Sequence, residues 1–157
     1  MTSPSLVQYY LRLGDDRLVL GHRLSEWCGH GPILEEDIAL TNIALDLIGG
    51  ATLLLALAGE TEGDGRTADT LAYLRDGVDY RNILFAELPN GDFGVTVARL
   101  FLFSVFSLLQ MEALQKSSNE TLAGIASKIV KEARYHVRHA AQWVITLGDG
   151  TDESHKR

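Results

Sequence analysis

Helical spacing of apolar residues is the feature that most constrains this chain, because only three prolines, at positions 4, 32 and 89, interrupt it. The residues that recur at intervals of seven are Leu6, Leu13, Leu20 and Trp27. Tyr10 and Leu24 fill the offset of four, which predicts the buried face of a long helix. Leu and Ala, which favour helix, number 25 and 15, whereas Val and Ile, which favour strands, number only 9 and 8. The sequence therefore predicts an all-α protein.

Prolines, glycines and capping residues predict where the helices begin and end. Ser3 is predicted as the N-cap of the first helix and Pro4 as its first residue, where a missing N–H costs nothing. We expect a first helix from 4 to the turn at 29–31 and a second helix beginning at 31–32. A crossover should follow, with a loop over 60–66, short helices over 68–75 and 78–87, and a turn over 89–92. The third long helix is expected over about 93–115 and the fourth from a capping box at 117–120 to 147, before a polar tail over 151–157.

The connections between these helices indicate the fold class. Two tight helical hairpins joined by one long crossover have the connectivity of a ferritin-like four-helix bundle. An up-down bundle with a long loop is the alternative, and the partly helical crossover favours the ferritin-like topology. We expect a single domain over residues 1–157. The second helix is predicted to bury the seam Leu34, Ile38, Thr41, Leu45, Ile48, Thr52 and Leu55.

Charge and composition exclude several classes of function. The net charge of −7 opposes binding to nucleic acid or to an anionic membrane surface. The longest uncharged stretches, 47–59 and 100–111, are shorter than the roughly 20 apolar residues that cross a bilayer, and the first residues do not resemble a signal peptide. Cys28 is the single cysteine, so no internal disulfide can form. The sequence predicts a cytoplasmic protein that binds neither nucleic acid nor membrane.

Several segments, in order along nearly the whole chain, carry a family resemblance. They are LRLGDDRLVLGHRLSEWCGH at 11–30, EDIALTNIALDLIG at 36–49, LPNGDF at 88–93, KEARYH at 131–136 and LGDGTD at 147–152. Together they resemble the structural (C) subunits of bacterial phenylacetyl-CoA epoxidases, which are multicomponent monooxygenases. The resemblance implies a ferritin-like fold, phenylacetate catabolism on the CoA thioester, and a non-catalytic subunit that scaffolds a catalytic oxygenase subunit in a cytoplasmic complex. Members of this family continue beyond the position at which this chain ends.

A ferritin-like fold also raises the alternative of an oxygen-activating enzyme with a di-iron centre. Such a centre takes a Glu from each of two helices and a Glu-x-x-His pair from each of the other two. No Glu in this chain has a His three residues later, and the third helix has no Asp, Glu or His from 93 to 111. We therefore expect no catalytic residue, metal or cofactor. The inward positions of the third helix are predicted to be Val97, Leu100, Ser104, Ser107 and Met111.

Glu132, His136 and His139 are the one set of potential ligands that remains. Their spacing of four and three residues puts them on one face of the fourth helix, where they could hold a single divalent ion in a degenerate or mononuclear site. Three ligands from one helix leave most coordination positions empty, which favours the alternative of a hydrogen-bonded core histidine. On that interpretation, His136 lies on a seam with Leu122, Ile129 and Trp143.

Two further sets of charged residues carry hypotheses. Arg17 falls on the inward seam of the first helix and should pair with Asp46 or Asp37, or else lie partly exposed at the bundle edge. A basic stripe on the fourth helix could contact CoA phosphates or an acidic partner, although a solvated face is the more frequent explanation. It comprises Lys128, Lys131, Arg134 and Arg138.

The third helix is apolar on every side, which predicts that something covers its outer face. The crossover helices or another subunit could do so, and the resemblance favours a subunit interface in a homo- or hetero-oligomer. A free-standing helical homodimer is a further alternative. The residues added around the inward seam are Phe101, Leu102, Phe103, Val105, Phe106, Leu108 and Leu109.

Overall fold

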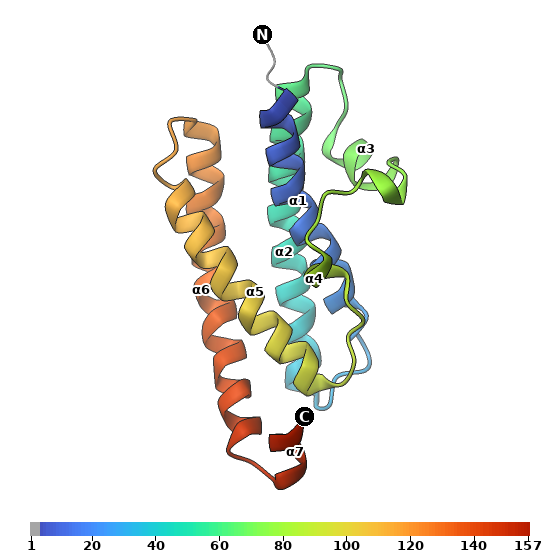
Figure 1. Cartoon of the computed structure of the whole chain (residues 1–157), viewed down its shortest axis with the longest axis vertical. Helices are drawn as coiled ribbons and strands as arrows, with labels where there is room; N and C mark the ends of the chain where they lie inside the picture. The colour runs from blue at the N-terminus through green and yellow to red at the C-terminus, as the bar shows by residue number, and fades with distance from the viewer. Residues whose placement is uncertain (1–3) are drawn as a thin grey trace. The chain divides into compact units, whose positions relative to one another are not determined.

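A computed structural model describes residues 4–157, and every regular element in that range is a helix (Figure 1). The chain divides after Leu88 into two compact units, which we call the N-terminal unit and the C-terminal unit. Each is built on one antiparallel pair of long helices, α1–α2 in the first and α5–α6 in the second. The predicted all-α class and the two hairpins of a ferritin-like bundle are confirmed.

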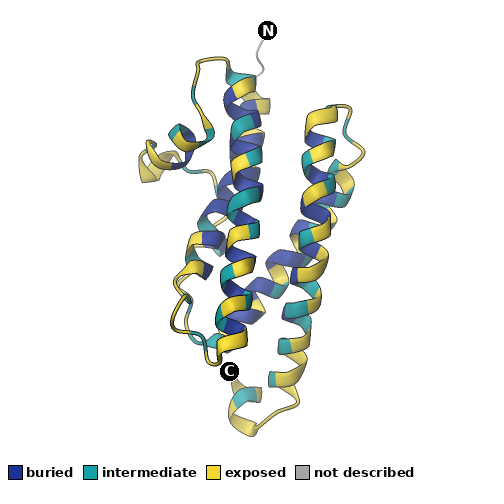
Figure 2. Cartoon of the chain, turned by 180° about the vertical axis from the view of Figure 1, so that it is seen from behind, coloured by how far each residue is buried: buried dark blue, intermediate teal, exposed yellow. Residues whose placement is uncertain are grey.

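The first hairpin pairs α1 (Pro4–Ser25) with α2 (Leu34–Glu62). Pro4 is the first helical residue, as predicted, whereas the expected cap at Ser3 lies outside the described residues. Most of the predicted face of α1 is correct, because Tyr10, Leu13, Leu20 and Leu24 are at most 2% exposed. Leu6 at one end of that face is 38% exposed, and Trp27 lies beyond the end of the helix. Figure 2 shows buried residues along the length of both helices.

The predicted start of α2 is wrong, and so is most of its predicted buried face, although Leu55 of that seam is 1% exposed. The helix begins at Leu34 rather than at Pro32, and the carboxylate of Asp37 accepts a hydrogen bond from Gly31 N at 3.0 Å. Leu34, Ile38 and Leu45 of the predicted seam are more than half exposed. Because α2 is apolar around most of its circumference, spacing alone could not select the face. The buried face instead carries Glu36, Leu40, Ile43, Ala44, Leu47, Gly50, Ala51, Leu54, Leu55, Leu57, Ala58 and Gly59.

Gly59 is required where the end of α2 meets the loop that follows it. The helix continues two residues into the predicted 60–66 loop and ends at Glu62, with Gly63 in the left-handed region at φ 79°. A Cβ on Gly59 would lie 2.1 Å from the carbonyl oxygen of Arg66. The returning loop therefore approaches the helix more closely than any side chain allows.

Gly59→Ala should lower the free energy of unfolding by about 1–3 kcal/mol, because the backbone at Arg66 must move away. Gly49→Ala is the matched control on the same helix, since a Cβ there meets nothing within 4 Å. The control should be neutral or stabilising by up to about 1 kcal/mol through helix propensity. Chemical denaturation of both variants measures the difference, and equal effects would contradict the close approach.

The crossover contains α3 (Ala68–Tyr73), a 3₁₀ turn (Gly77–Asp79) and α4 (Leu84–Glu87). The predicted helix over 68–75 is present in shorter form, capped by the Thr67 side chain, which accepts from Thr70 N at 3.1 Å. The predicted helix over 78–87 is wrong, because residues 80–83 are not helical. Backbone N–H groups of that segment donate to side chains of α1, as described below.

The second hairpin pairs α5 (Phe93–Leu114) with α6 (Glu120–Gly148). Both helices match the predicted ranges closely. Asn119 caps α6 by accepting from Leu122 N at 3.0 Å, in place of the predicted capping box that began at Ser117. The predicted polar tail forms α7 (Asp152–Lys156), which has a capping box of its own between Thr151 and Ser154.

Two helices are long and apolar enough to cross a membrane by length and composition, in contrast to the sequence expectation. They are α2 and α5, in which an 18-residue window keeps a high mean hydropathy and holds at most two charged residues. Such windows are also found in the core helices of soluble proteins, so this test by itself is weak evidence. Less than half of each apolar window is buried, which leaves apolar surface on both helices.

Candidate functional site

The buried face of α5 has no metal ligand. All five residues predicted to face inward are at most 4% exposed, so that prediction is confirmed. Val97, Leu100 and Met111 are apolar, and Ser104 and Ser107 supply only hydroxyl groups. A di-iron centre takes carboxylates and imidazoles from its helices. The residues on this face therefore do not fit the metal centre of catalytic ferritin-like proteins.

His136 on α6 lies in a packed interior. It is 4% exposed, and Leu122 and Ile129 on the same seam are 3% and 4% exposed. Trp143, the fourth member of the predicted seam, is half-buried and meets the ring of Phe93 edge-on, with centroids 5.0 Å apart. This placement agrees with the core-histidine interpretation.

The other two potential ligands do not join His136 in a metal-binding group. Glu132 and His139 are half-buried, and the His139 ring stacks on Tyr135 with centroids 5.9 Å apart. Within residues 4–157, no three His, Cys, Asp or Glu side chains converge on a point where they could hold a metal ion. The mononuclear-site hypothesis thus gains no support from the geometry.

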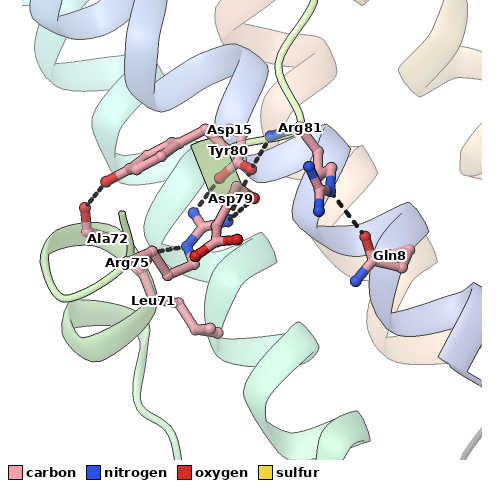
Figure 3. Close-up of polar contacts among 8 residues, drawn as sticks. All are labelled: Gln8, Asp15, Leu71, Ala72, Arg75, Asp79, Tyr80 and Arg81. Atoms are coloured by element: carbon pink, nitrogen blue, oxygen red, sulfur yellow. Dashed lines mark hydrogen bonds and ion pairs between the residues drawn. The ribbon is translucent and has the colours of Figure 1, made fainter. Parts of the chain in front are cut away.

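Asp15 on α1 is the centre of a buried polar cluster in the N-terminal unit (Figure 3). Its carboxylate pairs with both terminal nitrogens of Arg75, and the two side chains are 0% and 6% exposed. The same carboxylate accepts from Arg81 N at 2.8 Å. The guanidinium of Arg75 also lies 4.3 Å from the centroid of the Tyr80 ring. One α1 residue therefore bonds directly to two positions of the crossover, Arg75 and Arg81.

Asp16 holds the next part of the crossover. Its carboxylate accepts from Ile83 N at 2.7 Å, and the residue is 5% exposed. Burial raises the pKa of Asp16, and the Ile83 N–H and the charge of Arg17 offset part of that rise. Asp15 and Asp16 together form what we call the carboxylate clamp. It supplies acceptors for the backbone N–H groups of Arg81 and Ile83, which lie in a segment that is not helical.

The pKa shift at Asp16 predicts a pH dependence. A raised pKa means that the folded protein binds this proton more tightly than the unfolded chain, so stability falls as pH rises from about 4 through the raised value. Asp16→Asn keeps an oxygen for Ile83 N but cannot ionise. The melting temperature of the variant relative to wild type should therefore increase between about pH 4 and pH 7.

Thermal unfolding of both proteins across this pH range measures the effect. Asp76→Asn is the control, since Asp76 is exposed and its side chain makes no capping hydrogen bond. A difference between wild type and Asp16→Asn that stays constant or shrinks as pH rises would contradict the raised pKa.

Arg17 is buried, so the hypothesis that it lies partly exposed at an edge is wrong. It is 1% exposed and donates to the carbonyl oxygen of Leu13 at 3.1 Å. Pairing with Asp46 stays a prediction. The carboxylate clamp was not predicted from the sequence. Two adjacent acids on a face that also carries Leu13 and Leu20 were the signal that could have indicated buried polar contacts.

The basic stripe of α6 is exposed at all four positions, as a solvated face would be. Arg134 pairs with Glu112 of α5 at 3.0 Å, and Arg138 lies 5.7 Å from the centroid of the Tyr135 ring. A ligand for Lys128 and Lys131 stays a prediction.

Comparison with protein families decides where this chain belongs. The model of the phenylacetic acid catabolic protein family matches residues 1–157. The chain belongs to this family. One relative, the component designated C of the 1,2-phenylacetyl-CoA epoxidase of Escherichia coli K12, is 48% identical over 149 residues, which are 95% of this chain. The resemblance found in the sequence is confirmed.

The relative is longer than the protein described here. The matched residues are 60% of its length, so this chain spans about three fifths of the curated phenylacetic acid catabolic protein that it resembles. The match includes both helical hairpins, because only a few residues of this chain lie outside it.

Proposed function

We propose that this phenylacetic acid catabolic protein is a non-catalytic structural subunit that scaffolds the di-iron catalytic subunit of a multicomponent monooxygenase. The complex epoxidises phenylacetyl-CoA in the cytoplasm during phenylacetate catabolism. The observation that carries the proposal is the 48% identity to a protein named as one component of such an epoxidase. The inward face of α5, which has no carboxylate, supports a role without metal chemistry.

Co-expression with the catalytic subunit of a phenylacetyl-CoA epoxidase tests the scaffold role. The two chains should purify together, and phenylacetyl-CoA should be converted only when the catalytic subunit, a reductant supply and this chain are all present. The catalytic subunit without this chain should be less active or less soluble. Full activity of the catalytic subunit alone, with no complex formed, would refute the scaffold role.

The isolated chain should contain well below one iron, zinc or manganese atom per molecule and should not convert phenylacetyl-CoA. The reason is that α5 offers no ligand on its buried face and that Glu132, His136 and His139 do not converge. Elemental analysis after reconstitution with ferrous iron, followed by desalting, measures the metal. About two iron atoms retained per chain would favour an oxygen-activating enzyme instead.

A further inference from the structure

A cavity of about 370 Å³ lies between the second half of α1 and the crossover, within the N-terminal unit. We call it the crossover cavity. α1 contributes Leu18, Val19 and His22 to its wall, and the crossover contributes Tyr80 and Asn82. Neither carboxylate of the clamp lines it. Its volume falls within the range of small-molecule sites in proteins, which runs from about 300 to 1,000 Å³.

Part of the wall of the crossover cavity is apolar. Leu18 is buried and Val19 is half-buried. Tyr80 has only its ring left to offer a ligand, because its hydroxyl group donates to the carbonyl oxygen of Ala72 (Figure 3). A ligand with an alkyl or aryl body therefore removes apolar surface from water when it enters.

Three polar groups on the wall have no hydrogen-bond partner among the described residues. The side-chain nitrogen of Asn82 donates to the carbonyl oxygen of Ile83 at 3.1 Å, which leaves the amide oxygen without a donor. The carboxylate of Glu87 accepts no hydrogen bond, and the ring of His22 only stacks against Tyr73, with centroids 6.5 Å apart. Amide and carboxylate oxygens accept hydrogen bonds and donate none, so these groups suit a ligand that donates.

The charge around the crossover cavity is negative. Arg23 pairs with Glu26 at 2.9 Å, so the charges of these two wall residues balance each other. Arg23 also donates to the backbone carbonyl oxygen of Glu87 at 3.1 Å, which holds Glu87 at the cavity and leaves its carboxylate as the uncompensated charge. Residues 1–88 hold six arginines and no lysine against fourteen acidic residues, a net charge of −8. The potential here therefore favours a cation.

We propose that the crossover cavity binds an organic cation, an ammonium, guanidinium or amidinium group on an apolar body. The N–H groups of the cation donate to the oxygens of Glu87 and Asn82, and its body lies against Val19 and the ring of Tyr80. A free amine and an arginine or lysine side chain of another polypeptide both have this chemistry. The proposal goes beyond the scaffold role and does not rest on it.

Benzamidinium and benzamide are the matched probes, because they have the same size and shape and only benzamidinium is charged. Amide signals of Gly77 and Asn82, two residues of the wall, report binding in a nuclear magnetic resonance titration. Benzamidinium should bind with a Kd of about 1 mM, and benzamide at least about fivefold more weakly. Shifts that do not saturate by about 10 mM benzamidinium, or equal Kd values for the two probes, would overturn the proposal.

Glu87→Gln removes the charge of the wall and keeps its shape. It should weaken benzamidinium binding by about three- to tenfold and leave benzamide unchanged. Glu35→Gln is the matched control, because it removes the same charge from an exposed position of α2 outside the cavity, and it should leave both Kd values unchanged. Equal weakening by the two variants would overturn the proposal, since the overall charge of the unit would then account for binding.

Two further measurements locate the ligand and identify its source. Val19→Trp fills the cavity and should abolish binding of both probes, with unchanged amide signals elsewhere showing that the variant is folded; full binding by this variant would overturn the proposal. Arginine capped as Nα-acetyl methylamide is compared with its neutral citrulline counterpart. A Kd for capped arginine at or below that of benzamidinium assigns the site to a polypeptide side chain, and a higher Kd assigns it to a free cation. Failure of both cations to bind refutes both sources.

Discussion

Asp15→Ala should lower the free energy of unfolding by about 3–5 kcal/mol, the largest effect that we expect from one substitution. It leaves the guanidinium of Arg75, which is 6% exposed, without its carboxylate, and it leaves Arg81 N without an acceptor. A buried charge that loses its partner keeps its full cost of desolvation, and this cost exceeds what the ion pair contributes by forming. Chemical denaturation measures the loss.

The double variant Asp15→Ala with Arg75→Met separates the ion pair from the rest of the clamp. Removing both charges should recover a large part of the stability that the single variant loses, because no buried charge is then unpaired. Asp76→Ala, at an exposed position of the crossover, should change stability by less than about 0.5 kcal/mol. A single Asp15→Ala effect as small as that of Asp76→Ala would refute the clamp.

The clamp also predicts where the chain opens. Amide hydrogen exchange at Arg81 and Ile83 should be slow in wild type, because both N–H groups donate to the carboxylates of Asp15 and Asp16. In Asp15→Ala, protection at Arg81 should fall much further than protection in the middle of α1. Equal loss of protection in both places would indicate global unfolding rather than release of the crossover.

His136→Ala should lower the melting temperature by several degrees whether or not a metal chelator is present. The substitution removes a side chain that is 4% exposed, and it removes the polar or ring interactions that this side chain makes. Each effect costs on the order of 1–3 kcal/mol. In a chain of this size, 1 kcal/mol corresponds to roughly 2–4 °C. Thermal unfolding with and without chelator measures both contributions.

The same experiment distinguishes a core histidine from a metal ligand. A core histidine predicts that the chelator leaves wild-type melting unchanged, whereas a ligand predicts that the chelator destabilises wild type as much as the substitution does. His155→Ala, at an exposed position of α7, is the control and should change the melting temperature little. A chelator that lowers the melting temperature of wild type but not of His136→Ala would contradict the core interpretation.

The sequence by itself determined the helices and the buried faces of α1 and α5. On α1, apolar residues recur at intervals of three, four and seven, so the inward face has a distinct pattern even though Asp15, Asp16 and Arg17 are buried beside it. On α5, Ser104 and Ser107 marked the inward face within an otherwise apolar helix, and both are buried. The lack of ligands on that face was visible in the sequence, because a missing carboxylate needs no geometry to detect.

Only the tertiary structure decided the buried face of α2, the path of the crossover and the carboxylate clamp. α2 is apolar around most of its surface, so its own pattern does not select between the face at Leu40 and the face at Leu45, and packing against α1 does. Residues 80–83 are held by Asp15 and Asp16, more than 60 positions earlier in the chain. Local propensity carries no information about such a contact, because the hydrogen bonds that fix this segment exist only after the chain has folded back onto α1.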